Sequence, residues 1–96
     1  MKQAIWNGEV IAESETTVNI EGNAYFPHDT IFPEFFKKSE KHTTCPWKGE
    51  ASYYTIDVHG KENKDAAWFY PVVSEQASGI KNHVAFWRGV QIKEIN

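Results

Sequence analysis

The residues best suited to chemistry lie in one short segment, Thr43–Gly49, which reads Thr-Thr-Cys-Pro-Trp-Lys-Gly. It contains the only cysteine of the chain, followed by a proline, a large aromatic residue, a cation and a glycine. The thiolate is the reactive form of cysteine, and a nearby cation favours it. One hypothesis therefore makes Cys45 a catalytic nucleophile and Lys48 the cation that activates it. The alternative is that Cys45 packs in the core, because a lone free cysteine is commonly buried.

Two residues of this segment restrict its backbone. Pro46 confines Cys45 to extended conformations, while Gly49 permits a bend that a residue with a Cβ atom would resist. Such a segment can hold Trp47 and Lys48 away from a sheet. It can also be a stiff entry into the next strand, with Trp47 half-buried and Lys48 laid along it. The residue types alone leave both interpretations open.

Aromatic residues make up 15% of the chain, with six Phe, four Tyr and four Trp. At roughly 150–250 Å² buried apiece, they dominate the energetics of the core. Several alternate with smaller residues on predicted strands, a pattern that also lines pockets for planar or cationic small ligands. Core packing is the competing interpretation for each of them. The candidate ligand-binding residues are Tyr25, Trp47, Tyr53, Trp68 and Tyr70.

Composition argues against several classes of site and partner. Thirteen acidic residues oppose ten basic ones for a net charge of −3, and no basic patch suits nucleic acid. The four histidines are widely spaced and no second cysteine is present, so we predict neither a metal site nor a cofactor. No window approaches the roughly 18 uninterrupted apolar residues of a membrane span. Met1–Trp6 lacks the apolar core of a signal peptide, so we expect a cytoplasmic location.

The elements that position these residues are mainly antiparallel hairpins of a single domain spanning residues 1–96. Asn7-Gly8 is the dipeptide best suited to a type I′ turn, and period-two alternation over Glu50–Val58 indicates a long strand. Four hairpins are predicted, pairing Ala4–Trp6 with Glu9–Ala12, Thr17–Ile20 with Ala24–Phe26, Glu50–Val58 with Asp65–Tyr70 after a turn at Gly60–Lys64, and Val84–Trp87 with Val90–Lys93.

Helical signals are weak. Phe32, Phe35 and Phe36 recur at helical spacing, so a short helix is predicted over Pro33–Lys38. A polar loop over Ser39–Thr44 follows, and Ser74–Ala77 can make one helical turn. The predicted fold class is all-β, with one or two short helices and antiparallel hairpins that form two sheets. An exposed sheet edge in such a fold could support a homodimer.

The order of these motifs resembles a bacterial family, domain-of-unknown-function family 427. The matching elements are Tyr25-Phe26-Pro27, Cys45-Pro46-Trp47-Lys48-Gly49, Ala51, Tyr53-Tyr54, Ala67-Trp68, Tyr70-Pro71, Ile80 and Val84-Ala85-Phe86. The resemblance covers nearly the whole chain. It implies a fold like the β-tent, in which two antiparallel sheets meet at an angle.

Function does not follow from that resemblance. Other β-tent proteins hold a structural zinc with paired Cys-x-x-Cys motifs, and this chain has none, so zinc does not carry over. The family also carries a nucleotidyltransferase-style name, but the sequence contains neither a phosphate-binding loop nor a metal-binding pair of carboxylates.

Three functions from different classes follow from the residues. The first is a small-ligand binding module with an aromatic-lined cleft that the Cys45–Gly49 segment closes. The second is an enzyme that uses Cys45 and Lys48, with Tyr25 or His28 in proton transfer. The third is a structural or protein-interaction domain.

Overall fold

The computed structural model describes all residues from Met1 to Asn96 and contains nine β-strands in two antiparallel sheets. The strands are β1 (Lys2–Trp6), β2 (Glu9–Ser14), β3 (Val18–Ile20), β4 (Asn23–Pro27), β5 (Phe36–Cys45), β6 (Gly49–Val58), β7 (Lys61–Phe69), β8 (His83–Phe86) and β9 (Gln91–Glu94). Three short 3₁₀ helices connect them, η1 (His28–Thr30), η2 (Pro33–Phe35) and η3 (Glu75–Ile80). The predicted fold class, all-β with two antiparallel sheets, is confirmed.

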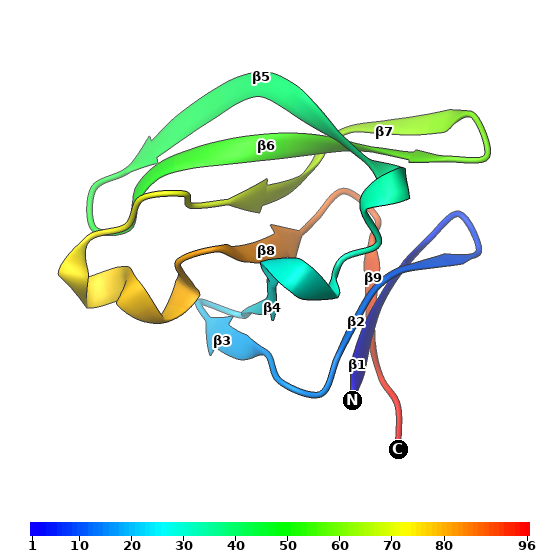
Figure 1. Cartoon of the computed structure of the whole chain (residues 1–96), viewed down its shortest axis with the longest axis horizontal. Helices are drawn as coiled ribbons and strands as arrows, with labels where there is room; N and C mark the ends of the chain where they lie inside the picture. Colours follow the sequence, from blue (N-terminus) through cyan, green and yellow to red (C-terminus); the bar gives the residue numbers. More distant parts are fainter.

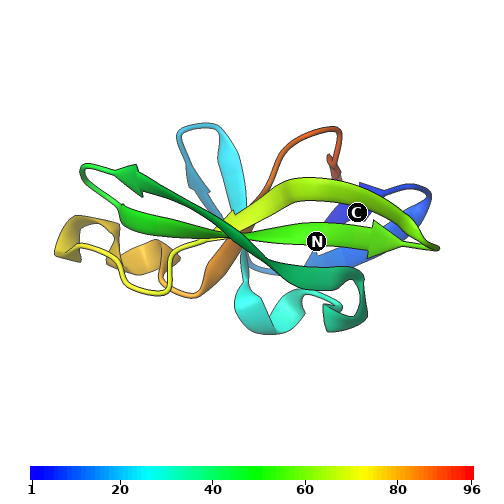
Figure 2. The same ribbon diagram turned by 90° about the horizontal axis from the view of Figure 1, so that it is seen from above.

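The larger sheet has six strands in the order β3-β4-β8-β7-β6-β5, and the smaller has the order β2-β1-β9. In Figure 1 the long strands β5, β6 and β7 run across the top of the molecule, while the small sheet crosses them at one end. Figure 2 shows the β3–β4 hairpin and the η1–η2 segment on opposite sides of the β5–β6–β7 ribbon.

The tight turns between strands are made by residues with positive φ angles. Asn7 and Gly8 have φ angles of 50° and 75°, as the type I′ prediction requires, and β1 pairs with β2. Glu21 and Gly22 make an equivalent turn between β3 and β4, with φ angles of 53° and 80°. The central hairpin also forms, but its turn is the pair at positions 59 and 60, so β7 begins at Lys61, earlier than predicted.

The predicted helix over Pro33–Lys38 is wrong, and so is the loop over Ser39–Thr44. Only Pro33–Phe35 is helical, and Phe36–Cys45 is a ten-residue strand at the edge of the large sheet. The Phe36 ring packs edge-on against Tyr54 and Phe86, two residues that are far from it in the sequence. These long-range contacts override the helical spacing of the phenylalanines. Its sequence is polar, as in a loop, because most side chains of this edge strand face solvent.

The predicted hairpin at the C-terminus is also wrong, although its turn exists. Arg88 and Gly89 have φ angles of 56° and 84°, but the strands on either side enter different sheets. The first, β8, lies between β4 and β7, and the second, β9, pairs with β1. Turn chemistry specifies that the chain reverses, but the free edge of β1 decides where β9 pairs.

The two faces of the large sheet carry separate apolar clusters. Neighbouring residues Tyr53 and Tyr54 on β6 point to opposite faces, as strand geometry requires. The Tyr54 face packs against the small sheet. The other face carries a second cluster, to which η3 contributes Ala77 and Ile80. Its buried members are Tyr25, Ala51, Tyr53, Tyr70, Ala77, Ile80 and Ala85.

A close backbone contact fixes the turn between β5 and β6 on the second face. Gly49 has a φ angle of 118°, and a Cβ atom there would lie 2.8 Å from the carbonyl oxygen of Val72. The Ser74 amide donates a hydrogen bond to the Lys48 carbonyl at 3.2 Å, and the Ser74 hydroxyl donates to the Trp47 carbonyl. The bend predicted at Gly49 is therefore present, and only glycine fits it without strain.

We expect Gly49→Ala to lower the free energy of unfolding by about 2 kcal/mol or more, because the new methyl group meets both steric strain and a left-handed φ angle. Gly79→Ala is the matched control, since Gly79 has open space around it and no positive φ angle. It should change stability by less than about 1 kcal/mol. Urea denaturation of both variants measures the difference, and equal midpoints would contradict the argument.

Candidate functional site

A pocket of about 170 Å³ opens on the second face of the large sheet. Tyr53 on β6 and Trp68 on β7 contribute to it from adjacent strands. Tyr70 follows β7, Lys48 lies in the β5–β6 turn, and Trp87 follows β8. Five side chains from four parts of the chain therefore meet at one opening.

The aromatic walls are held in defined orientations. Tyr53 lies directly opposite Trp68 in the β6–β7 ladder. The Trp87 ring meets Trp68 edge-on, with ring centroids 5.9 Å apart and an angle of 80°, and lies 6.5 Å from the Tyr53 ring at 42°. The Trp87 indole donates to the Asp65 carbonyl at 2.6 Å, and the Trp68 indole donates to the Tyr25 hydroxyl at 3.3 Å. These bonds fix both indoles, so the pocket is largely preformed.

The cation of the pocket is almost fully buried. Lys48 is 7% exposed, and its ammonium group forms an ion pair with Glu21 in the β3–β4 turn. Its Nζ atom also lies 5.2 Å from the centre of the Trp47 ring. Burial alone lowers the pKa of Lys48, but the hydrogen bond to Glu21 and the interactions with Tyr25 and Tyr70 raise the pKa above the usual lysine value. Lys48 is therefore protonated and paired with Glu21.

Tyr70 is the second polar group of the pocket. It is 5% exposed, and burial, together with the neighbouring Tyr25, raises the pKa of its hydroxyl to about 12 although Lys48 opposes the shift. No polar side-chain atom in the structure is both sealed from solvent and unbonded. The Tyr70 hydroxyl forms no hydrogen bond to another residue, so it is not sealed from solvent, and Tyr70 lines the pocket.

The sequence-predicted site residues separate into two groups. Lys48, Tyr53, Trp68 and Tyr70 line the pocket. The other three do not line it: Tyr25 is fully buried and bonded to Trp68, while Cys45 and Trp47 are partly buried against the same apolar cluster. The ammonium of Lys48 is directed to Glu21.

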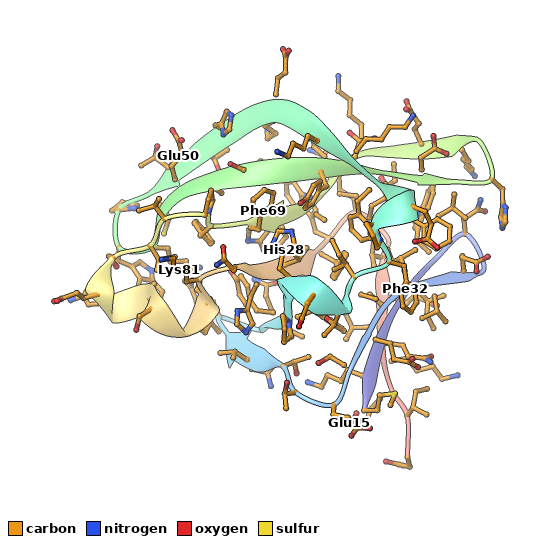
Figure 3. All side chains as sticks on the ribbon, viewed as in Figure 1. Glu15, His28, Phe32, Glu50, Phe69 and Lys81 are labelled. Atoms are coloured by element: carbon orange, nitrogen blue, oxygen red, sulfur yellow. The ribbon has the colours of Figure 1, made fainter.

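Neither His28, the histidine considered for proton transfer, nor His42, three residues before Cys45, lines the pocket. His42 is exposed and contacts Ser52 at 3.3 Å. His28 is on the opposite face of the sheet, where its Nε2 atom bonds to the Tyr54 hydroxyl at 2.8 Å and its ring packs against Phe69 (Figure 3). Burial lowers the pKa of His28 below the usual histidine value. Neither histidine contacts Cys45.

Sequence reasoning missed two residues of this region. Trp87 was placed in a regular hairpin, yet it stands just beyond β8 and its backbone amide donates to the Ala66 carbonyl at 3.0 Å. A large aromatic residue directly before the Arg88-Gly89 turn was the available signal. Glu21 lies between the predicted strands Thr17–Ile20 and Ala24–Phe26, and no local pattern connects it to Lys48.

A known protein family covers nearly the whole chain. A family model described as "Domain of unknown function (DUF427)" matches residues 2–95. The chain belongs to this family. No curated protein was found to match it. The suspected family is thereby confirmed, and its description assigns no activity to this DUF427 domain.

Two further observations describe this DUF427 domain. None of its helices is long and apolar enough to cross a membrane. No group of three or more His, Cys, Asp or Glu side chains is arranged to hold a metal ion.

We expect Tyr70 to make stability depend on pH in alkaline solution. The phenol titrates near pH 10 in the unfolded chain and at about 12 in the folded one, so unfolding releases a proton between these values. The contribution of neutral Tyr70 to the free energy of unfolding is complete below pH 10 and is lost as the pH rises toward 12. Urea denaturation between these pH values should show a steeper loss of stability for the wild type than for Tyr70→Phe. Equal slopes would contradict this assignment.

We expect Cys45 to react with iodoacetamide at pH 7 no faster than free glutathione. Lys48, the cation that would activate it, is paired with Glu21, and Cys45 does not line the pocket. The rate is measured by mass spectrometry on the folded protein, with the urea-unfolded chain as the control. A rate well above that of glutathione would favour the catalytic hypothesis, which stays a prediction.

Proposed function

We propose that this DUF427 domain is a binding module for a small planar ligand, held in the pocket of Lys48, Tyr53, Trp68, Tyr70 and Trp87. The observation that supports this most directly is the combination of aromatic walls with a buried ammonium group and an accessible hydroxyl. Ligand sites typically join apolar walls to a few placed polar groups, which supply orientation and specificity.

The pocket volume restricts the size of the ligand. About 170 Å³ is available, and an engineered cavity of about 150 Å³ in another protein binds benzene. A single six-membered ring with one small substituent therefore fits, whereas a fused ring system with long substituents would extend into solvent. Stacking and edge contacts with Tyr53, Trp68 and Trp87 favour an aromatic or otherwise planar ring.

The polar groups indicate which substituent the ring carries. Lys48 can donate hydrogen bonds but cannot accept them, so an acceptor such as a carbonyl or carboxylate oxygen suits it. Its positive charge also disfavours a cationic ligand, which the sequence alone had left open. The Tyr70 hydroxyl can donate to or accept from the same substituent.

We expect benzamide, a neutral single ring with a carbonyl group, to bind and to shift the indole NMR signals of Trp68 and Trp87. The signal of Trp6 in the small sheet is an internal reference. Trp87→Ala should weaken binding about tenfold, because it removes one aromatic wall. Since Trp87 is 41% exposed, the truncation leaves most of the core intact.

Ile92→Ala is the matched control, since Ile92 is 40% exposed and lies on β9 in the other sheet. It should bind benzamide as the wild type does. If benzamide leaves the Trp68 and Trp87 signals unchanged, or if both variants bind it equally, the pocket is not a site for planar ligands.

A further inference from the structure

The ion pair between Lys48 and Glu21 is strongly asymmetric. The Lys48 side chain is 8% exposed, whereas the Glu21 side chain is 56% exposed. A buried ammonium group is costly without a partner, but a carboxylate that is already half in water loses little when it is released. Lys48 therefore needs a counter-ion, while the particular counter-ion is replaceable.

The segment that carries Glu21 is only lightly attached. Glu21 occupies the two-residue turn between β3 and β4, and β3 is a three-residue strand at the edge of the large sheet. The ion pair with Lys48 is the only interaction that the Glu21 side chain makes. Because the Glu21 side chain is 56% exposed, we expect rotation about its own side-chain bonds to free the carboxylate without a rearrangement of the sheet.

We propose that the physiological ligand is a single-ring carboxylate, and that its carboxylate replaces Glu21 on Lys48. This inference rests on the proposed function, because burial of the ring against Tyr53, Trp68 and Trp87 supplies the affinity. When one carboxylate replaces another, Lys48 is still paired with one negative charge. Glu21 then acts as a built-in competitor that keeps the pocket's cation paired in the free protein.

Lys48 distinguishes a carboxylate from a neutral ring in this exchange, while competition from Glu21 limits the size of that preference. A neutral ring cannot offer Lys48 a negative charge, so it binds alongside the intact ion pair. A cationic ring also offers Lys48 no negative charge, so it gains nothing from the exchange. Glu21 thus tunes the preference for carboxylates, although it does not line the pocket itself.

Calorimetric titration of the full chain with benzoate and with benzamide tests the exchange, because the two probes have nearly the same shape and differ in charge. We expect Glu21→Gln to bind benzoate about three- to tenfold more tightly than the wild type, since the competing carboxylate is gone. Its affinity for benzamide should stay within about twofold. Lys48→Met should lose the preference for benzoate over benzamide, while the exposed Glu21 stays hydrated.

Glu15→Gln is the control for the loss of one negative charge. Glu15 is exposed, forms no ion pair, and lies beside the chain termini in Figure 3, whereas Glu50 marks the β5–β6 end of the sheet. It should bind both probes as the wild type does. A circular dichroism spectrum and a melting curve establish that each variant is folded.

The outcomes separate this inference from the function on which it rests. If benzamide binds but Glu21→Gln gains nothing for benzoate, the exchange is wrong and the planar-ligand site stands. If benzoate affinity falls in Glu21→Gln, the carboxylate of Glu21 assists binding and the inference is again overturned. If neither probe binds to the wild type or to any variant, the proposed function itself fails, and this inference fails with it.

Discussion

The contact between the β5–β6 turn and the segment after β7 is the constraint on which the pocket depends. Gly49 brings the backbone close to the Val72 carbonyl, and Ser74 bonds to the carbonyls of Trp47 and Lys48. Through these contacts the segment that carries Lys48 is pinned beside the segment that carries Tyr70. A larger residue at position 49 would separate the two, and the two polar groups of the pocket would no longer meet.

The second requirement is that the sheet present large rings on a face that nothing fully covers. Tyr53 and Trp68 face each other across the β6–β7 ladder, and Trp68 has Ala85 on its other side. A small residue at that position leaves room next to the indole. Trp87 then leaves the sheet and closes one side of the opening, where it is held by its bond to Asp65. The pocket is thus a gap in the packing of one face, bordered by rings whose orientations are fixed.

The opposite face follows different rules, although it is equally aromatic. There His28, Tyr54, Phe36 and Phe69 pack against one another beside the core shared with the small sheet. Burial raises the pKa of Tyr54 and lowers the pKa of His28, so both groups are held in their neutral forms. No buried cation joins them. Lys48, more than the number of aromatic rings, therefore distinguishes the candidate site from the opposite face of the sheet.

The sequence by itself determined what depends on near neighbours in the chain. The turns at Asn7-Gly8 and Arg88-Gly89, the alternation of β6 and the bend at Gly49 follow from the φ angles that each residue tolerates and from the period of a strand. Period-two alternation also places Trp68 and Tyr70 on one face of a predicted strand, but it does not say whether that face carries a pocket or only core.

Only the tertiary structure decided which strands are partners. It placed Phe36–Cys45 at a sheet edge, sent β8 and β9 into different sheets, and brought Trp87 to the pocket and Glu21 to Lys48. It also packed Cys45 against the apolar cluster of that face, outside the pocket lining. These outcomes depend on contacts between residues far apart in the chain, whose energies compete across the whole fold and leave no local pattern.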